Sequence, residues 1–128
     1  MHRGMEELNE LSCKIIGAAM KVHSALGPGL LESAYEACLI HELGKAGLEA
    51  KSQVPLPVFY DSIMIDLGYR LDLLVEDSVI IELKAVESIS AIHEAQIISY
   101  LKLSGKKLGL LINFNVLHLR DGVTRKVN

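Results

Sequence analysis

The sequence predicts an α/β fold of the α+β type, in which a mixed central β-sheet is flanked by helices in the order ααβββ(β)αβββ. Three observations lead to this prediction. From about residue 5 to 26, apolar residues recur at three- and four-residue steps, the spacing of an amphipathic helix. Between residues 49 and 84, β-rich runs alternate with turn signals. From residue 108 to 114, an apolar run with one glycine is typical of a buried strand.

Composition limits the class of protein. The chain has 128 residues, half of them hydrophobic, so we expect a single domain, residues 1–128, with a substantial core. No apolar run approaches the ~20 residues of a membrane span, and the acidic, amphipathic N-terminus does not resemble a signal peptide. Cys13 and Cys38 lie far apart in apolar helical patterns, which predicts reduced core cysteines in a cytoplasmic protein.

The charge balance bears on the partner. A net charge of −3 argues against a protein that coats nucleic acid, because such proteins are normally basic. It leaves room for a metal-dependent enzyme that acts on nucleic acid, since bound cations offset the carboxylates of such a site.

A second helix is expected from about residue 30 to 46, after the breaker at residues 27–29, GPG. Glu32 in its first turn either complements the helix dipole or provides a carboxylate aimed at a site elsewhere. His23 either caps the end of the first helix or is a metal ligand close to Glu32. Much of the apolar side of the second helix is expected from Leu31, Ala34, Cys38 and Leu39.

The extended segments differ in their expected place. Residues 49–60 contain Pro55 and Pro57, which confine this piece to an edge or irregular strand. Shorter strands are expected at residues 63–67, 116–120 and 123–127. The last two are expected to pair through a hairpin at Asp121 and Gly122.

A third helix is expected from a cap at Ser88 or Ser90 to about residue 103. Offsets of three and four residues place His93, Gln96 and Tyr100 on one face of it. That polar face is either a solvated flank or a surface that orients a substrate or a carboxylate. Its apolar neighbours are Ile89, Ile92 and Leu103, and the buried stripe continues through Ile97, Ile98 and Leu101.

Residues 69–84, YRLDLLVEDSVIIELK, form the stretch around which the chain is organised. Two β-rich runs flank a short polar break, which predicts a hairpin whose loop is centred on Asp77. In that register Val75 faces Val79.

The same register places Asp72 directly opposite Glu82, with Lys84 on the same face one pleat along. Two carboxylates this close repel each other unless a cation lies between them. A hard divalent ion would make them ligands, because Mg²⁺ favours oxygen donors. The simpler interpretation is a surface hairpin with a solvated Glu–Lys pair or a structural ion pair.

Three motifs together resemble a known family. Residues 29–35, GLLESAY, match the GxxExxY signature of a small bacterial protein family. Asp72 followed by residues 82–84, ELK, resembles the D…ExK core of the PD-(D/E)XK nuclease superfamily, to which that family is assigned. Residues 96–100, QIISY, resemble the QxxxY motif of its RecB-like and Cas4-like exonucleases. The resemblance covers nearly the whole chain and implies a restriction-endonuclease-like core.

The resemblance implies metal-dependent hydrolysis of a phosphodiester. Asp72 and Glu82 would then hold Mg²⁺ or Mn²⁺, joined by the backbone carbonyl of Leu83. Lys84 would orient or activate the attacking water. RecB-like members also use a helix histidine as a ligand, and His23 is the nearest match.

Further residues are expected around this site. Glu32 is a further candidate carboxylate for catalysis and metal binding. Gln96 would hold a phosphate or a ligand water, and Tyr100 would stack or hydrogen-bond at the mouth of the site. The expected substrate is nucleic acid, DNA more than RNA, and the small size suits a homodimer with two sites acting on two strands. Two other functions compete: a noncatalytic nucleic-acid- or partner-binding module on the same fold, and a small-molecule or metal-binding protein.

Overall fold

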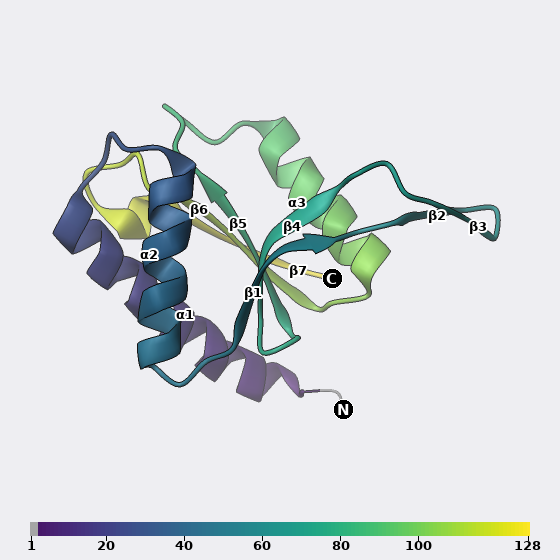
Figure 1. Cartoon of the computed structure of the whole chain (residues 1–128), viewed down its shortest axis with the longest axis horizontal. Coiled ribbons are helices and arrows are strands. Elements are labelled where there is room, and N and C mark those ends of the chain that lie inside the picture. The colour runs from purple at the N-terminus through teal and green to yellow at the C-terminus, as the bar shows by residue number, and fades with distance from the viewer. Residues whose placement is uncertain (1–2) are drawn as a thin grey trace.

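A five-stranded β-sheet lies between two layers of helices in the computed structural model, which describes residues 3–128 (Figure 1). Helices α1 and α2 cover one face of the sheet, and α3 covers the other. The helices are α1 (Met5–Leu26), α2 (Glu32–Lys45), α3 (Ala91–Ser104) and the short 3₁₀ helix η1 (Leu119–Gly122). The strands are β1 (Ala50–Pro55), β2 (Val58–Tyr60), β3 (Ile63–Ile65), β4 (Arg70–Val75), β5 (Val79–Lys84), β6 (Leu108–Asn113) and β7 (Val123–Val127).

The sheet has the strand order β1-β4-β5-β6-β7. Strands β5 and β6 are parallel and are connected through α3, while the other neighbours are antiparallel. This mixed sheet with flanking helices confirms the predicted fold class. The edge position predicted for the proline-containing segment is also confirmed, because β1 is the first strand of the sheet.

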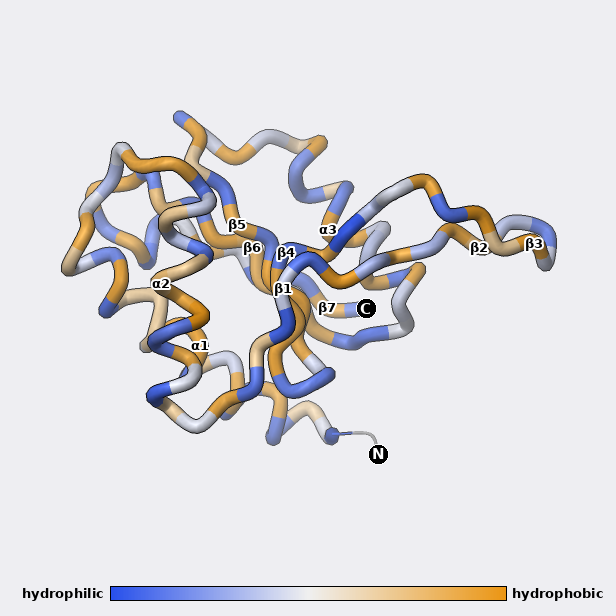
Figure 2. Tube along the Cα trace, viewed as in Figure 1, coloured by the Kyte–Doolittle hydropathy of each residue, from blue (hydrophilic) through white to orange (hydrophobic). Residues whose placement is uncertain are grey.

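The core consists of two apolar clusters, one on each face of the sheet. The larger cluster packs α1 and α2 against the sheet, and the smaller one packs α3 against it. Strand β6 is buried along its whole length, as its continuous apolar run predicts. Figure 2 shows the resulting concentration of apolar residues in the central strands. None of the helices described for residues 3–128 is long and apolar enough to cross a membrane.

Helices α1 and α3 begin and end close to where the sequence predicts. Ser90 is the N-cap of α3, accepting a hydrogen bond from the His93 N–H, while His93 Nδ1 accepts one from the Ser90 N–H. This reciprocal pair is a capping box with histidine in the place of the usual acid or amide. The expectation that Ile92 lies beside the core is wrong, because its side chain is exposed.

Two expectations about the first two helices are wrong. The buried stripe of α2 is Tyr35, Leu39 and Leu43, whereas Leu31 is 77% exposed. Leu31 is the N-cap, with extended φ and ψ of −72° and 151°. Its side chain therefore does not lie on the same helix face as Tyr35, as it would if residue 31 were helical. Cys13 is exposed on α1 rather than buried in the core.

The C-terminal segment also differs from its prediction. Residues 116–120 do not form a strand; they enter η1, and β7 pairs with β6 instead. The reason is a close approach at Gly122, where a Cβ atom would lie 2.2 Å from the backbone oxygen of Asn113. Gly122 therefore permits a tight return of the chain onto β6 rather than a two-residue hairpin turn.

Strands β2 and β3 form a separate two-stranded sheet between β1 and β4. We call residues 57–69 the arm. It projects away from the three layers, on the side where α3 lies (Figure 1). The strand predicted for residues 63–67 is present but ends at Ile65.

Candidate active site

The central hairpin opens at the position of the two predicted acids. Strands β4 and β5 pair Val75 with Val79, as the sequence predicts, and their described pairing ends at Leu73 and Ile81. One residue further, side-chain carboxylates accept the hydrogen bonds that backbone carbonyls accept in a regular ladder. The Asp72 N–H donates to Glu82 Oε2 at 2.9 Å, and the Leu83 N–H donates to Asp72 Oδ2 at 2.8 Å.

The backbone on the other side of β4 is irregular at the same level. Strand β1 pairs its Ser52 and Val54 with β4 but leaves out Gln53, which has a left-handed φ of 52°. Leu71 packs with the α3-side cluster, although strict alternation from Leu73 would send it to the opposite face. This distortion lies at Asp72, and it gives the carboxylate room between the strands.

Strand β5 directs backbone groups as well as side chains to this opening. The Lys84 carbonyl accepts from the Phe114 N–H, so it points toward β6. The Leu83 N–H points the other way, to Asp72. Because the N–H and C=O of one strand residue point to the same side, the Leu83 carbonyl is directed toward β4 and the opening.

Glu82 is a buried acid with a strongly perturbed pKa. Its side chain is only 4% exposed, and burial raises its pKa from 4.5 to about 8. The negative charge of Asp72 is the second cause, and the more distant Glu32 adds to it. The Asp72 N–H and the Lys84 ammonium act in the opposite direction without cancelling the rise. Without a cation, Glu82 therefore carries a proton at neutral pH.

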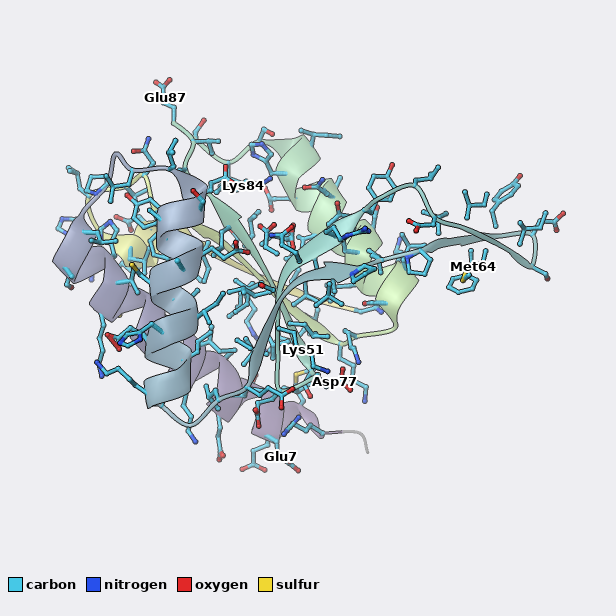
Figure 3. The ribbon with its side chains drawn as sticks, in the orientation of Figure 1. Glu7, Lys51, Met64, Asp77, Lys84 and Glu87 are labelled. Atoms are coloured by element: carbon cyan, nitrogen blue, oxygen red, sulfur yellow. The ribbon has the colours of Figure 1, made fainter. Side chains whose placement is uncertain are left out.

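Lys84 stands at the end of β5, between α2 and α3 (Figure 3). It is half-buried and lines a hollow of about 390 Å³ together with Gln96, His93 and Ser99 of α3. The Gln96 side-chain amide donates to the Tyr100 hydroxyl at 3.1 Å. The structure thus brings the polar face of α3 to the charged end of β5.

Tyr100 also belongs to this neighbourhood. Its pKa is raised, first by burial and then by the negative charges of Glu82 and Asp72. Its phenol therefore remains a hydrogen-bond donor at any physiological pH. The ring of Tyr69, at the base of the arm, lies 6.2 Å from the Tyr100 ring between centroids, so the two tyrosines form one aromatic wall.

Glu32 approaches the opening from the other side. It is exposed at the first turn of α2 and lines a cavity of about 170 Å³ with Asp72 and Leu83. Glu32 lies at the positive end of the α2 dipole, and its part in a metal site stays a prediction. Ser33, Glu36 and Gln53 complete the lining of that cavity.

Tyr35, three residues after Glu32, holds the loop that precedes α2. Its hydroxyl donates to the Gly27 carbonyl at 2.6 Å and accepts from the Leu30 N–H at 3.1 Å. Its ring stacks on Phe114 with centroids 4.5 Å apart. Tyr35 therefore fixes the loop that leads into α2, and with it the place of Glu32.

His23 lines a different hollow, with Gly27 and Pro28 and with residues 117–120 around η1. Its Nε2 donates to the Val116 carbonyl at 2.7 Å, and the buried ring lies 6.3 Å from Phe114 between centroids. Within residues 3–128, no three His, Cys, Asp or Glu side chains are grouped so that they could hold a metal ion by themselves. A cation at the opening would therefore need backbone or water oxygens in addition to the acids.

Sequence reasoning missed Asn113 as a positioning residue. Its buried amide accepts from the Val86 N–H and donates to the Val86 carbonyl, at 3.1 Å and 2.9 Å. Asn113 pairs with Lys84 across the parallel strands, so it ties down the chain just after the lysine. The available signal was a single polar residue at the carboxyl end of an apolar run.

These features define a class: a restriction-endonuclease-like α/β domain with paired acids and a lysine at an opening of its central sheet. A family model described as the PD-(D/E)XK nuclease superfamily matches residues 9–126, and the chain belongs to that superfamily. Comparisons with curated proteins and with solved structures find no match. The predicted membership in the superfamily is confirmed, while the narrower resemblance to GxxExxY proteins stays a prediction.

Proposed function

We propose that this protein is a metal-dependent nuclease that hydrolyses phosphodiester bonds in nucleic acid. The observation that carries the proposal is the meeting of Asp72 and Glu82 in the opened ladder, with Lys84 two residues further along β5. Superfamily membership supports the reaction class. Neither the buried Glu82 nor the half-buried Asp72 takes part in a described salt bridge of residues 3–128, so no structural ion pair explains the two acids.

The donor set fits a hard divalent cation. Asp72 and Glu82 offer carboxylate oxygens, and the Leu83 carbonyl is directed to the same opening. Mg²⁺ and Mn²⁺ prefer oxygen ligands of this kind. Glu32 lines the same small cavity as Asp72 and Leu83 and would hold the cation directly or through water. His23 is left out of the proposed ligand set because it lines a different hollow, with residues of the α1 end and η1, and not the cavity that Asp72 and Leu83 line.

A bound cation would polarise the scissile phosphate and stabilise the charge that develops on its oxygens. The raised pKa of Glu82 means that its uncharged form is favoured without a cation, and a bound metal would offset the charge of the carboxylate form. Lys84 would orient the attacking water and place a positive charge beside the phosphate. Gln96 and the protonated Tyr100 would donate hydrogen bonds to phosphate oxygens.

A cleavage assay tests the proposal. Labelled single- and double-stranded DNA and RNA are incubated with the protein in Mg²⁺, Mn²⁺ or EDTA, and we expect cleavage only with metal, on DNA more than on RNA. Asp72→Asn and Glu82→Gln should abolish it. Asp77→Asn is the matched control, because this exposed acid lies on the turn at the other end of the same hairpin (Figure 3). Cleavage that persists in Asp72→Asn would refute the proposal.

Thermal melts separate metal binding from chemistry. At a hundredfold excess over its dissociation constant, a ligand stabilises the folded state by about 2.7 kcal/mol. The wild type should show such a Mn²⁺-dependent rise in melting temperature, and Asp72→Asn should lose it. Lys84→Ala should keep most of the rise but not cleave, whereas the exposed Lys107→Ala should resemble the wild type.

A noncatalytic nucleic-acid-binding module is the second candidate. The absence of a three-side-chain metal group among residues 3–128 favours it. It predicts binding of nucleic acid in EDTA, no metal-dependent rise in melting temperature and no cleavage with any metal. The melts and the cleavage assay together therefore decide between the two functions.

A further inference from the structure

Seven of the fifteen exposed large apolar side chains described for residues 3–128 lie on the arm. They are between 36% and 72% exposed: Phe59, Tyr60, Ile63, Met64, Ile65, Leu67 and Tyr69. Figure 2 shows apolar residues along both arm strands, with hydrophilic residues at the turn and at the base. Met64 lies on the arm, far from Lys84 (Figure 3).

Both faces of the arm are apolar. Tyr60 pairs with Ile63 on one face, and Phe59 pairs with Met64 on the other, because cross-strand partners share a face and successive residues alternate. An isolated two-stranded hairpin is only marginally stable in water. The arm therefore needs a partner that reaches more than one of its faces.

The charges of the arm disfavour nucleic acid as that partner. Asp61 at the turn and Asp66 after β3 are both exposed acids. They would repel phosphates, and contacts to nucleic acid come mainly from basic residues. Arg70, at the base, is the one cation between residues 56 and 70.

We infer that the arm is a dimerisation element that packs antiparallel against the arm of a second copy of this chain. In this arrangement the turn of each arm reaches the base of the other, so Asp61 of one copy lies beside Arg70 of its partner. Two such ion pairs form around one twofold axis, because a twofold interface uses the same patch on both subunits. Within residues 3–128, neither Asp61 nor Arg70 forms a salt bridge in its own chain.

The area and shape of the arm suit this occupant. With roughly 200 Å² for each large side chain, the exposed fractions correspond to on the order of 700 Å² of apolar surface on one arm. A standard interface takes about 800 Å² from each partner. Two-stranded ribbons are strongly twisted, so two adjacent arms coil around each other and keep their apolar side chains in contact along their length.

Sedimentation velocity in EDTA tests the inference through a charge exchange. The wild type should sediment as a dimer at about 100 µM protein, a concentration well above a dissociation constant in the low micromolar range. Asp61→Lys and Arg70→Glu should each raise the dissociation constant about tenfold, which corresponds to ~1.4 kcal/mol. The double variant should restore it to within about threefold. The strain of lysine at the left-handed Asp61 is the same in the single and double variants, so it does not explain the restoration.

A second pair of variants covers the apolar contacts. Ile63→Ser and Met64→Ser change side chains that are already exposed in one chain, so the monomer should keep its far-UV circular dichroism and melting behaviour while the dimer is lost. Leu117→Ser is the matched control, since Leu117 is also exposed but lies outside the arm, and it should leave the dimer intact. These outcomes do not depend on catalysis, because the paired acids lie in the sheet.

Three results would overturn the inference. The first is a wild type that sediments as a monomer under these conditions. The second is a dimer that persists in Ile63→Ser and Met64→Ser, which would place the interface elsewhere. The third is a monomeric protein whose affinity for a fluorescent single-stranded oligonucleotide in EDTA falls in the same arm variants, which would make the arm a nucleic-acid contact.

Discussion

Asp72 and Glu82 lie opposite each other and each carboxylate accepts a hydrogen bond from the backbone of the other strand: Glu82 Oε2 from the Asp72 N–H, and Asp72 Oδ2 from the Leu83 N–H. These side-chain bonds stand in place of backbone hydrogen bonds between β4 and β5. They link the two strands, but at a wider spacing than a regular ladder. They also bring the half-buried Asp72 against the buried Glu82, and the two acids cannot both be charged at low cost. The pair therefore responds to protons and to cations.

Glu82 should make the metal-free protein less stable as the pH rises. Its pKa is near 4.5 in the unfolded chain and about 8 in the folded one, so between these values the folded state binds more protons. The free energy of unfolding consequently falls from pH 4.5 to 8 and levels off above. Glu82→Gln cannot ionise, and its stability relative to the wild type should rise across this window by on the order of a few kcal/mol, since a pKa difference of one corresponds to ~1.4 kcal/mol.

Urea denaturation at several pH values in EDTA measures this difference. Asp77→Asn is the control, because Asp77 is exposed and its removal should leave the pH dependence of stability close to that of the wild type between pH 6 and 9. A stability difference between wild type and Glu82→Gln that is constant from pH 5 to 8 would show that Glu82 titrates normally.

Metal binding should release a proton. Near pH 7 Glu82 is protonated because its pKa is about 8, and a cation at the opening requires the carboxylate form. Titration calorimetry with Mn²⁺ in two buffers of different ionisation enthalpy should show about one proton released at pH 7 and almost none at pH 9. The affinity should fall about tenfold for each pH unit below 8. Binding without proton release at pH 7 would exclude Glu82 as a ligand.

Tyr35→Phe should destabilise the fold through the loop that precedes α2. The lost hydroxyl leaves the Gly27 carbonyl and the Leu30 N–H without their partner, at a cost of about 1–3 kcal/mol. Urea denaturation measures the loss. The chemically identical change Tyr60→Phe is the control, because the Tyr60 ring is exposed on the arm and forms none of these bonds. Equal midpoints for the two variants would contradict the role of the hydroxyl.

The sequence predicts the centre of this molecule better than its periphery. The register of the central hairpin follows from a short loop between apolar runs, and this register places Asp72 against Glu82. The exposed position of Leu31 does not follow, because it depends on where the helix backbone begins rather than on hydrophobicity. The engagement of His23 by Val116 depends on a contact 93 residues away, which local patterns do not encode.

Local sequence patterns do not predict the tight return of the chain after β6 either. An alanine at Gly122, where the chain returns, and one at Gly17 should change the free energy of unfolding in opposite directions. Gly122→Ala places a Cβ 2.2 Å from the Asn113 backbone oxygen, so β6 or η1 must move, and we expect a loss of about 3 kcal/mol, typical of an overpacked site. Gly17→Ala adds a methyl group on an open face of α1, where no atom lies within 4 Å, and should gain about 0.5–1 kcal/mol of helix propensity.

Thermal melts of the two variants give the comparison, and cleavage extends it to the site. Asn113 binds Val86 just after Lys84, so a shift at Asn113 should reach the lysine. Under the proposed function, Gly122→Ala should lower cleavage even at temperatures where it remains folded, whereas Gly17→Ala should not. If Gly122→Ala has the same melting temperature as the wild type, the fold does not need the tight return onto β6. The position of Lys84 would then be set by β5 alone.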